Sequence, residues 1–266
     1  MLLLFRYGNG MDTVLTTTHK TTDDTANPDI YVIAAHPAWR ESRVNRPLME
    51  AAKALPRVQM QDLYSSYPDY AIDVPLEQAA LERARLVVLV HPIQWYSMPP
   101  LQKLWLDDVL TYGWAYGEGE EGQGRALEGK DLWLVATTGG PEESYHPQGY
   151  NRYFFDAFLP PYEQTAALCG MRFLPPLVLH GAHTVDRQTV VSHVETFSQR
   201  LQSYPDWPEL EDLEQCAACV VPMRDRSVAH DDPSNAGNEF FAGPPQGKLA
   251  PSGGSALHEV KSVGTP

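Results

Sequence analysis

Residues 86–117 read LVVLVHPIQWYSMPPLQKLWLDDVLTYGWAYG, and this stretch decides the fold. Its first five residues form a continuous apolar run, which is typical of a strand buried on both faces of a parallel sheet. Apolar residues then recur at three- and four-residue spacing over 101–109, which predicts a helix with one buried face. Ser97, ahead of Pro99 and Pro100, is the expected N-terminal cap. The loop between strand and helix is the expected ligand site, because open α/β sheets bind ligands there.

Further strands and helices alternate on either side of this unit. The apolar and β-branched runs predict strands at 30–35, 58–63, 131–138 and 172–180. The amphipathic stretches predict helices at 43–55, 75–84, 151–169 and 186–203. Short apolar strands that alternate with helices indicate a parallel sheet covered on both faces. We therefore expect a doubly wound α/β domain with a five-stranded parallel sheet over residues 29–204.

The two ends of the chain have a different composition. Residues 1–28 are rich in Thr, Asp and Asn and show no periodicity, so they are expected to be a flexible leader. Residues 205–266 are rich in Pro, Gly, Ser and acidic residues and are expected to be a mostly disordered tail. The tail contains Cys216 and Cys219 in a CxxC spacing, but no second CxxC accompanies it, so no metal site is predicted.

The net charge of −14 excludes some classes of partner. Of this charge, −8 falls on residues 1–204 and −6 on residues 205–266, so both parts repel phosphate backbones. Nucleic acid is therefore not an expected partner. Three cysteines give no disulfide framework, which suits a reducing cytosol. No apolar run reaches the length of a membrane span, so the chain is expected to be cytoplasmic.

Three loops are predicted at one edge of the sheet, and each holds polar or flat side chains. After the first strand, Ser42 and Asn45 open a helix, where hydroxyl, amide and backbone N–H groups can bind a phosphate, although both are also ordinary caps. After the third strand, Trp95 and Tyr96 can line a flat ring or simply belong to the core. After the fourth strand, residues 137–140 (TTGG) allow close backbone approach. Together the three loops predict a nucleotide-type site.

The combined pattern resembles a known family. HPxxxxSxxN follows the first strand, HPxQWYSxPPLxKLWxDxVxxxGWAYG the third, and TTGG the fourth, while LPPLVLHGAH covers the fifth. These motifs resemble the flavodoxin-like NAD(P)H:quinone oxidoreductases, in particular the bacterial ancillary proteins of glutathione-regulated potassium-efflux systems. The long middle motif is the specific part, whereas TTGG alone is not. The likeness extends over about residues 29–204.

The resemblance implies a flavin, usually FMN in the bacterial branch and FAD in the animal branch. The phosphate and ribityl chain would lie against the first loop, the isoalloxazine against the second, and its pyrimidine side against the third. The implied cofactor-binding residues are His36, Ser42, Arg43, Val44, Asn45, Pro92, Ile93, Gln94, Trp95, Tyr96, Thr137, Thr138, Gly139 and Gly140. Members of the family are typically homodimers with the active site near the subunit interface. Trp114 to Tyr116 are expected near the substrate face or this dimer interface.

The implied catalytic group consists of three residues that lie downstream of the TTGG motif. Tyr145 stands at the position of a family tyrosine that helps to stabilise negative charge on reduced flavin. Asn151 stands where the animal-type enzymes have a histidine, and an asparagine cannot carry a positive charge. His146, the residue after Tyr145, is the candidate substitute, although a loop histidine more commonly faces solvent.

The activity implied by the resemblance is two-electron, ping-pong hydride transfer from NAD(P)H through flavin N5 to a quinone. The sequence does not distinguish NADH from NADPH, and FAD is the alternative to FMN. A second interpretation is a regulatory ancillary subunit of a potassium-efflux antiporter, held at the inner membrane through that partner. A third is a flavodoxin-type electron carrier, which the GWAYG segment disfavours.

Overall fold

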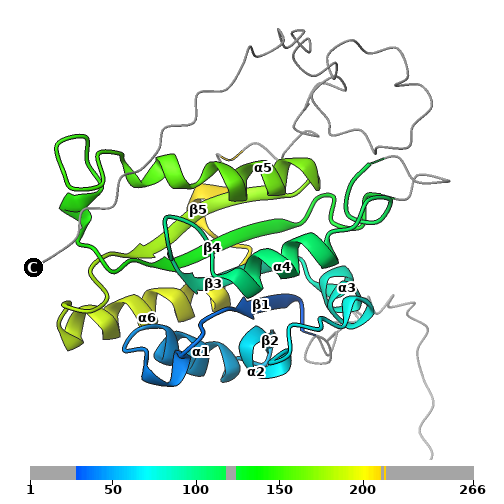
Figure 1. The fold of residues 1–266 in the computed structure, drawn as a ribbon. Coiled ribbons are helices and arrows are strands. Elements are labelled where there is room, and N and C mark those ends of the chain that lie inside the picture. Colours follow the sequence, from blue (N-terminus) through cyan, green and yellow to red (C-terminus); the bar gives the residue numbers. More distant parts are fainter. Residues whose placement is uncertain (1–27, 118–123, 211–212, 214–266) are drawn as a thin grey trace, which may run out of the picture. The chain divides into compact units, whose positions relative to one another are not determined.

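The computed structural model describes residues 28–117, 124–210 and 213, which contain a five-stranded, all-parallel sheet (Figure 1). The strand order is β2-β1-β3-β4-β5. The strands are β1 (Ile30–Ala34), β2 (Val58–Asp62), β3 (Leu86–Pro92), β4 (Asp131–Thr137) and β5 (Arg172–Leu179). The α-helices are α1 (Asn45–Lys53), α2 (Leu63–Ser66), α3 (Val74–Arg83), α4 (Pro100–Val109), α5 (Pro160–Leu168) and α6 (Arg187–Ser203). The predicted fold class is confirmed. The expected leader and most of the expected tail lie outside the described residues.

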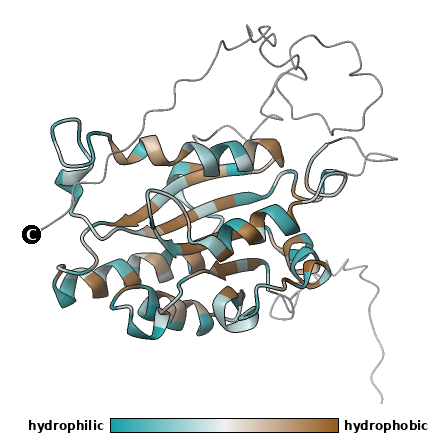
Figure 2. Ribbon diagram, viewed as in Figure 1, coloured by the Kyte–Doolittle hydropathy of each residue, from teal (hydrophilic) through white to brown (hydrophobic). Residues whose placement is uncertain are grey.

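Helices cover both faces of the sheet because the strand residues alternate between two apolar clusters. Val87 and Leu89 face the cluster that contains α3, α4 and α5, whereas Val88 and Val90 face the cluster that contains α1 and α6. Figure 2 shows the strands as mostly hydrophobic, with the helices hydrophobic on one side only. A strand buried on both faces needs apolar residues at successive positions, which is why continuous apolar runs identified the central strands; β2, at the edge of the sheet, alternates instead.

Two local predictions were wrong. The helix predicted from residue 151 begins at Pro160, because the paired prolines at 160 and 161 fit the first turn of a helix but not its interior. Residues 155–158 form a 3₁₀ helix instead. Ser97 does not cap α4: Pro99 occupies the cap position without a side-chain hydrogen bond, and the backbone of Ser97 pairs with Gln94.

The segment after Tyr204 packs on the domain as far as the 3₁₀ helix Pro208–Leu210. Trp207 is only 3% exposed, and its ring packs edge-on against Trp133 at 4.9 Å between centroids. Its indole N–H donates to the backbone carbonyl of Arg200 at 2.8 Å. The boundary expected after Tyr204 therefore falls inside a packed segment.

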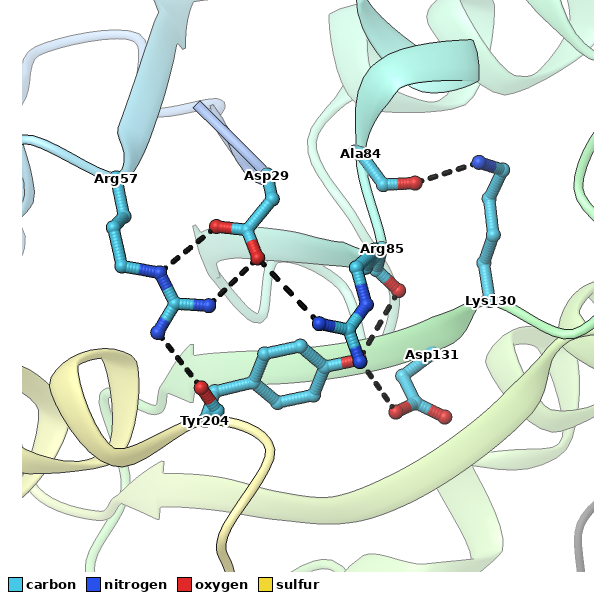
Figure 3. Close-up of polar contacts among 7 residues, drawn as sticks. All are labelled: Asp29, Arg57, Ala84, Arg85, Lys130, Asp131 and Tyr204. Carbon is cyan, nitrogen blue, oxygen red and sulfur yellow. Dashed lines mark hydrogen bonds and ion pairs between the residues drawn. The ribbon is translucent and has the colours of Figure 1, made fainter. Parts of the chain in front are cut away.

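Charged residues at the starts of the strands hold the amino edge of the sheet together (Figure 3). Arg57, before β2, makes a bidentate contact with Asp29, before β1, at 2.9 and 2.6 Å. Arg172, the first residue of β5, makes the same kind of contact with Asp131, the first residue of β4, at 2.7 and 2.9 Å. The Tyr204 hydroxyl donates to Asp131 at 2.8 Å, which fixes the end of α6 to this edge (Figure 3).

A buried carboxylate in α3 accepts hydrogen bonds from side chains of several other elements. Glu77 of α3 is fully buried and accepts four hydrogen bonds from neutral donors. The donors are the hydroxyls of Tyr31 at 2.6 Å and Tyr67 at 2.5 Å, the indole N–H of Trp105 at 2.7 Å, and the side-chain amide of Gln61 at 2.7 Å. They come from β1, β2, α4 and the residue after α2. Burial and the adjacent carboxylate both raise the pKa of Tyr31 and of Tyr67, so both hydroxyls keep their protons to donate.

We predict that Glu77→Gln lowers the free energy of unfolding by about 2–4 kcal/mol, because one carboxylate oxygen becomes an N–H₂ group that faces other donors in the core. Urea unfolding at pH 7 measures this change. Glu195→Gln, at an exposed position of α6, is the matched control and should change stability by less than about 0.5 kcal/mol. A Glu77→Gln effect as small as that of the control would contradict the role given to the carboxylate.

Candidate functional site

Three loops meet at the carboxyl edge of the sheet, where β1, β3 and β4 end side by side. Thr137, the last residue of β4, joins them. Its hydroxyl oxygen accepts from the side-chain amide of Asn45 at 3.0 Å, and its carbonyl oxygen accepts from the backbone N–H of Ile93 at 2.7 Å. Thr137 and Asn45 are both 2% exposed, so these bonds are shielded from water. The predicted convergence of the three loops is thus present in the structure.

The first loop presents donors at the start of α1. The Ser42 oxygen accepts from the backbone N–H of Asn45 at 3.0 Å and from its side-chain amide at 3.3 Å. Both acceptor positions of Ser42 are then used, so its hydroxyl can bind a ligand only as a donor. The Nδ1 atom of His36 accepts from the N–H of Ala38 at 3.1 Å, which puts the ring proton on Nε2. Burial lowers the pKa of His36.

The side-chain oxygen of Asn45 is buried and has no hydrogen-bond partner within the chain. A buried polar atom without a partner costs about 1–3 kcal/mol, so its presence calls for an explanation. The Asn45 amide nitrogen is fully used, since it contacts both Ser42 and Thr137. The orientation of the amide is therefore fixed, and its oxygen is available to a hydroxyl or N–H donor of a ligand.

Arg43 connects this loop to the one after β5. Its guanidinium donates to the backbone carbonyls of His183 at 2.8 Å and Val185 at 3.0 Å. Its charge therefore stays beside the amino end of α1, where unpaired N–H groups and the helix dipole also favour an anion. Val44 is buried as the residue before α1, so its side chain belongs to the core.

The second loop is a tight turn with aromatic residues at its tip. The backbones of Gln94 and Ser97 pair in both directions at 2.8 and 3.0 Å. Trp95 and Tyr96 between them have φ angles of 48° and 64°, in the left-handed region that non-glycine residues rarely adopt. The Trp95 side chain is 95% exposed, and Tyr96 stacks on Phe158 at 5.4 Å. This strained turn displays two flat rings at the ligand edge, while Pro92 and Ile93 lie half-buried behind it.

The third loop surrounds the hydroxyl of Thr138. This residue is 1% exposed, and its hydroxyl donates to the carbonyl of Gly140 at 2.8 Å. Gly139 is exposed and has no side chain, so its backbone is open to an approaching ring. Tyr145 is 9% exposed within a group of aromatic rings, and burial raises the pKa of its hydroxyl.

The three residues predicted as catalytic have different surroundings. Tyr145 packs edge-on against Phe158 at 5.9 Å, and Phe158 also stacks on Tyr96. The side-chain oxygen of Asn151 accepts from the hydroxyl of Tyr96 at 3.4 Å, so Tyr145 and Asn151 belong to one group. His146 is exposed and packs against Phe154 instead.

Sequence reasoning missed His180 and the rings around it. The imidazole lies 5.1 Å from the ring of Tyr145 and 5.2 Å from that of Phe155. Its Nδ1 atom is 3.0 Å from the hydroxyl of Thr138. The motif LPPLVLHGAH contained the signal, because His180 directly follows a strand whose neighbour ends in TTGG.

Trp114 to Tyr116 lie at the far end of α4 from the second loop. The Trp114 indole donates to Glu82 near the end of α3, and the Trp114 carbonyl accepts from Ala126, just before β4. Ten helical residues separate the two ends of α4, or about 15 Å. They therefore lie apart from the second loop of their own chain, and their place near the substrate face or a dimer interface stays a prediction.

The described part of the chain contains no helix long and apolar enough to cross a bilayer. Within the same residues, no group of three or more His, Cys, Asp or Glu side chains is arranged to hold a metal ion. Cys169 is buried, and burial raises the pKa of its thiol to about 12. Cys216 and Cys219 lie outside the described residues.

The five-stranded parallel sheet and the loops at its carboxyl edge define a flavodoxin-like protein. Residues 28–201 match the family model of the flavodoxin-like fold, and the chain belongs to this family. It is 43% identical over 177 residues to the glutathione-regulated potassium-efflux system ancillary protein KefF of Citrobacter koseri, an alignment that covers 66% of this chain and 97% of that relative. The resemblance inferred from the motifs is confirmed.

Solved structures with the same fold are also similar to this chain. General stress protein 14 of Treponema denticola, in complex with FMN, is 34% identical, with a TM-score of 0.62 over 66% of this chain and 99% of that one. An NADPH-quinone reductase from P. pentosaceus is 25% identical, with a TM-score of 0.58 over 65% of this chain and 97% of that one. The chain is thus similar to an FMN-binding protein and to a quinone reductase.

His91 gives the site a predicted sensitivity to acid. Its ring is fully buried, stacks on Tyr162 at 5.7 Å, and has an Nε2 atom without a partner. Burial lowers the pKa of His91 from 6.5 to about 4. The unfolded chain therefore binds a proton between pH 6.5 and 4 that the folded chain does not, so stability falls as pH falls through this window.

We expect His91 to contribute about 3 kcal/mol to the loss of stability between pH 7 and 4. His91→Phe keeps a ring on Tyr162 but removes the titration. Urea unfolding at pH 7 and pH 4.5 should show a smaller acid loss for the variant than for the parent chain. Equal losses in both proteins would rule out His91 as a source of acid sensitivity.

Proposed function

We propose that this chain is a flavin-dependent NAD(P)H:quinone oxidoreductase that holds FMN at the carboxyl edge of its sheet. The observation that carries the proposal is the buried, unpartnered oxygen of Asn45, at the point where Thr137 joins the three loops. A ribityl chain offers hydroxyl donors to such an oxygen, and the similarity to an FMN-bound structure supports this choice of ligand. FAD is the alternative cofactor.

The residues present fit a flavin mononucleotide. His36, Ser42, Arg43 and the start of α1 offer donors and positive charge to the phosphate. The turn at Gln94 to Tyr96 offers flat rings and backbone groups to the isoalloxazine. Gly139 and Gly140 offer partly exposed backbone to the pyrimidine side, whereas the N–H and carbonyl of the buried Thr138 are already bonded to Leu179 and Ala182.

When bound, the flavin supplies two-electron transfer as a hydride from NAD(P)H to the quinone. The chain supplies orientation and a proton donor. Tyr145 keeps its proton because burial raises the pKa of its hydroxyl, and it can give a hydrogen bond to an oxygen that gains negative charge. The rings of Phe155 and Phe158 keep water from Tyr145, which strengthens that hydrogen bond.

Absorbance of the purified protein, with identification of the released flavin, tests the cofactor. NADH and NADPH oxidation with and without a soluble quinone tests the reaction. Quinone-dependent oxidation supports the oxidoreductase, whereas flavin binding without NAD(P)H oxidation would instead indicate a flavodoxin-type carrier. A colourless protein that takes up no added FMN would overturn the proposal.

The same proposal includes a homodimer. Trp95, Tyr150, Tyr153 and Phe154 are 95%, 87%, 62% and 54% exposed, an unusual set of bare aromatic rings. Burial of these rings against a second copy would close the site from one side. Sedimentation of the purified chain tests this, and a monomer at micromolar concentration would contradict it.

A second candidate function is that of an ancillary subunit of a potassium-efflux antiporter. The 43% identity to a KefF protein, aligned over 97% of that relative, supports this candidate. The chain would then be cytoplasmic and peripheral to the inner membrane through its partner. Co-purification with an antiporter encoded in the same genome tests the interaction, and both functions can belong to one protein.

Asn45→Leu should weaken FMN binding by about tenfold to a hundredfold. The substitution removes the free oxygen and both amide bonds, while its volume stays similar. Quenching of FMN fluorescence measures the dissociation constant. The exposed Glu195→Leu variant on α6 is a control outside the three loops, and equal affinities for Asn45→Leu and the parent would contradict the assignment.

Tyr145→Phe should lower quinone reduction by about tenfold while FMN stays bound, because the ring packing is kept and one hydrogen bond is lost. Stopped-flow measurement of flavin reduction and reoxidation locates the affected half-reaction. Tyr70→Phe, at an exposed position outside the rings around Tyr145, is the matched control. Unchanged rates in Tyr145→Phe would remove this residue from the mechanism.

A further inference from the structure

Three polar side chains are buried on the face of the sheet that α3, α4 and α5 cover. His91 and Gln102 are 0% exposed, and Tyr162 is 1% exposed. Four of their polar atoms have no hydrogen-bond partner among the described residues: Nε2 of His91, both amide atoms of Gln102 and the hydroxyl of Tyr162. Buried polar atoms in native proteins nearly always have a partner, so a group of four calls for an explanation.

Two of these side chains are in direct contact. The rings of His91 and Tyr162 stack at 5.7 Å between centroids, with 21° between their planes. His91 is the last residue but one of β3, and Tyr162 lies in the first turn of α5. The ring pair therefore lies at the carboxyl end of β3, where the second loop begins.

The packing of α4 on α5 brings Gln102 to the same place. A small cavity between these helices is lined by Leu89 of β3, Leu106 of α4 and Thr165 of α5, among others. Both helices run antiparallel to the strands, because α4 follows the end of β3 and α5 precedes the start of β5. From the cavity toward the carboxyl edge, a step of two residues on β3, four on α4 or three on α5 leads to the three polar side chains. The steps are about 6.6, 6 and 4.5 Å long and keep to one face of each element, so Gln102 lies beside the ring pair.

The four atoms divide into two acceptors and two donors. Nδ1 of His91 lies 3.0 Å from the carbonyl oxygen of Pro92, which can only accept, so Nδ1 carries the ring proton. Burial lowers the pKa of His91 to about 4, so the ring is neutral at pH 7.5 and Nε2 is an acceptor. The Gln102 oxygen is the second acceptor. The Gln102 amide nitrogen and the Tyr162 hydroxyl are donors, since burial raises the pKa of Tyr162 and keeps its proton in place.

We propose that His91, Gln102 and Tyr162 form a buried binding site for water, which holds one or two molecules. Water donates two hydrogen bonds and accepts two, so it complements both kinds of atom in the site. A cation would leave the donors unmatched, and an anion would leave the acceptors unmatched. The burial of all three side chains excludes larger polar ligands. The adjacent cavity is lined almost entirely by apolar side chains and should stay dry.

The water joins three elements of the fold. It ties the first turns of α4 and α5 to the end of β3, directly before Pro92 and Ile93 of the second loop. This support for the loop does not depend on a bound flavin. The water site and the proposed function can therefore fail separately.

The number of bound waters can be measured directly. Oxygen-17 relaxation dispersion of the solvent counts the waters that stay inside the full chain for long times. At pH 7.5 the parent should hold one or two more such waters than the double variant His91→Phe/Gln102→Leu, which keeps only the Tyr162 hydroxyl of the site. Equal numbers in the two proteins would overturn the proposal.

Urea unfolding at pH 7.5 distinguishes a hydrated site from a dry one. Where water bridges the three side chains, Gln102→Leu should raise the unfolding equilibrium constant about tenfold, because the remaining partners lose their water. In a dry site the same substitution removes two unpartnered atoms and lowers that constant, which would overturn the proposal. Gln199→Leu, at an exposed position of α6, is the matched control and should change the constant by less than about threefold. A Gln102→Leu effect no larger than that of the control would also overturn it.

The double variant tests whether the side chains share one ligand. Residues that bind the same water are not additive, so Gln102→Leu should raise the unfolding constant by less than about threefold in the His91→Phe background. A tenfold rise in both backgrounds would show that Gln102 acts alone and would overturn the shared site. A parent chain that binds no FMN would refute the proposed function and leave these measurements to decide the water site.

Discussion

The buried carboxylate of Glu77 is the constraint on which one face of the fold depends. An ion without water costs several kcal/mol unless its partners compensate. Here four neutral donors from β1, β2, α4 and the residue after α2 do so at 2.5–2.7 Å. Each donor can reach Glu77 only when its element is in place. Because Trp105 lies in α4, this network also fixes the helix that follows the aromatic turn at Trp95.

The two edges of the sheet use polar groups in opposite ways. At the amino edge, the Asp29–Arg57 and Asp131–Arg172 pairs satisfy each other, so few polar groups are left for a ligand. At the carboxyl edge, Thr137 and Thr138 also collect bonds from neighbouring loops, but the oxygen of Asn45 stays without a partner. The Asn45 oxygen is one of several buried polar atoms without a partner among the described residues, and its place between the three loops is what supports the proposed ligand site at the second edge.

The strands could be predicted from sequence because burial on both faces demands apolar residues, and the ligand edge followed from the strand order of such folds. The group of side chains around Tyr145 could not be predicted from the sequence. Thr138 and His180 are 42 residues apart and meet only because β4 and β5 are neighbours. Trp95 and Tyr96 have positive φ angles although neither is glycine, so the sequence contained no residue that would predict this turn. Trp207 was assigned to the tail because the residues around it are rich in proline and acidic side chains, and a single tryptophan did not indicate that its ring is buried.

The chain before α5, which the prolines at 160 and 161 keep from continuing that helix, provides contacts that offset the strain of that turn. Two non-glycine residues in the left-handed region cost about 1–2 kcal/mol each, which surrounding contacts have to offset. The contacts are the stack of Tyr96 on Phe158 and the bond from Tyr96 to Asn151. Asn151 and Phe158 are seven residues apart. In an α-helix they would lie on the same side, separated by about 10 Å along the axis. The irregular segment 151–159 brings both Asn151 and Phe158 to Tyr96, and Phe158 also packs on Tyr145, so this segment holds the aromatic turn beside Tyr145.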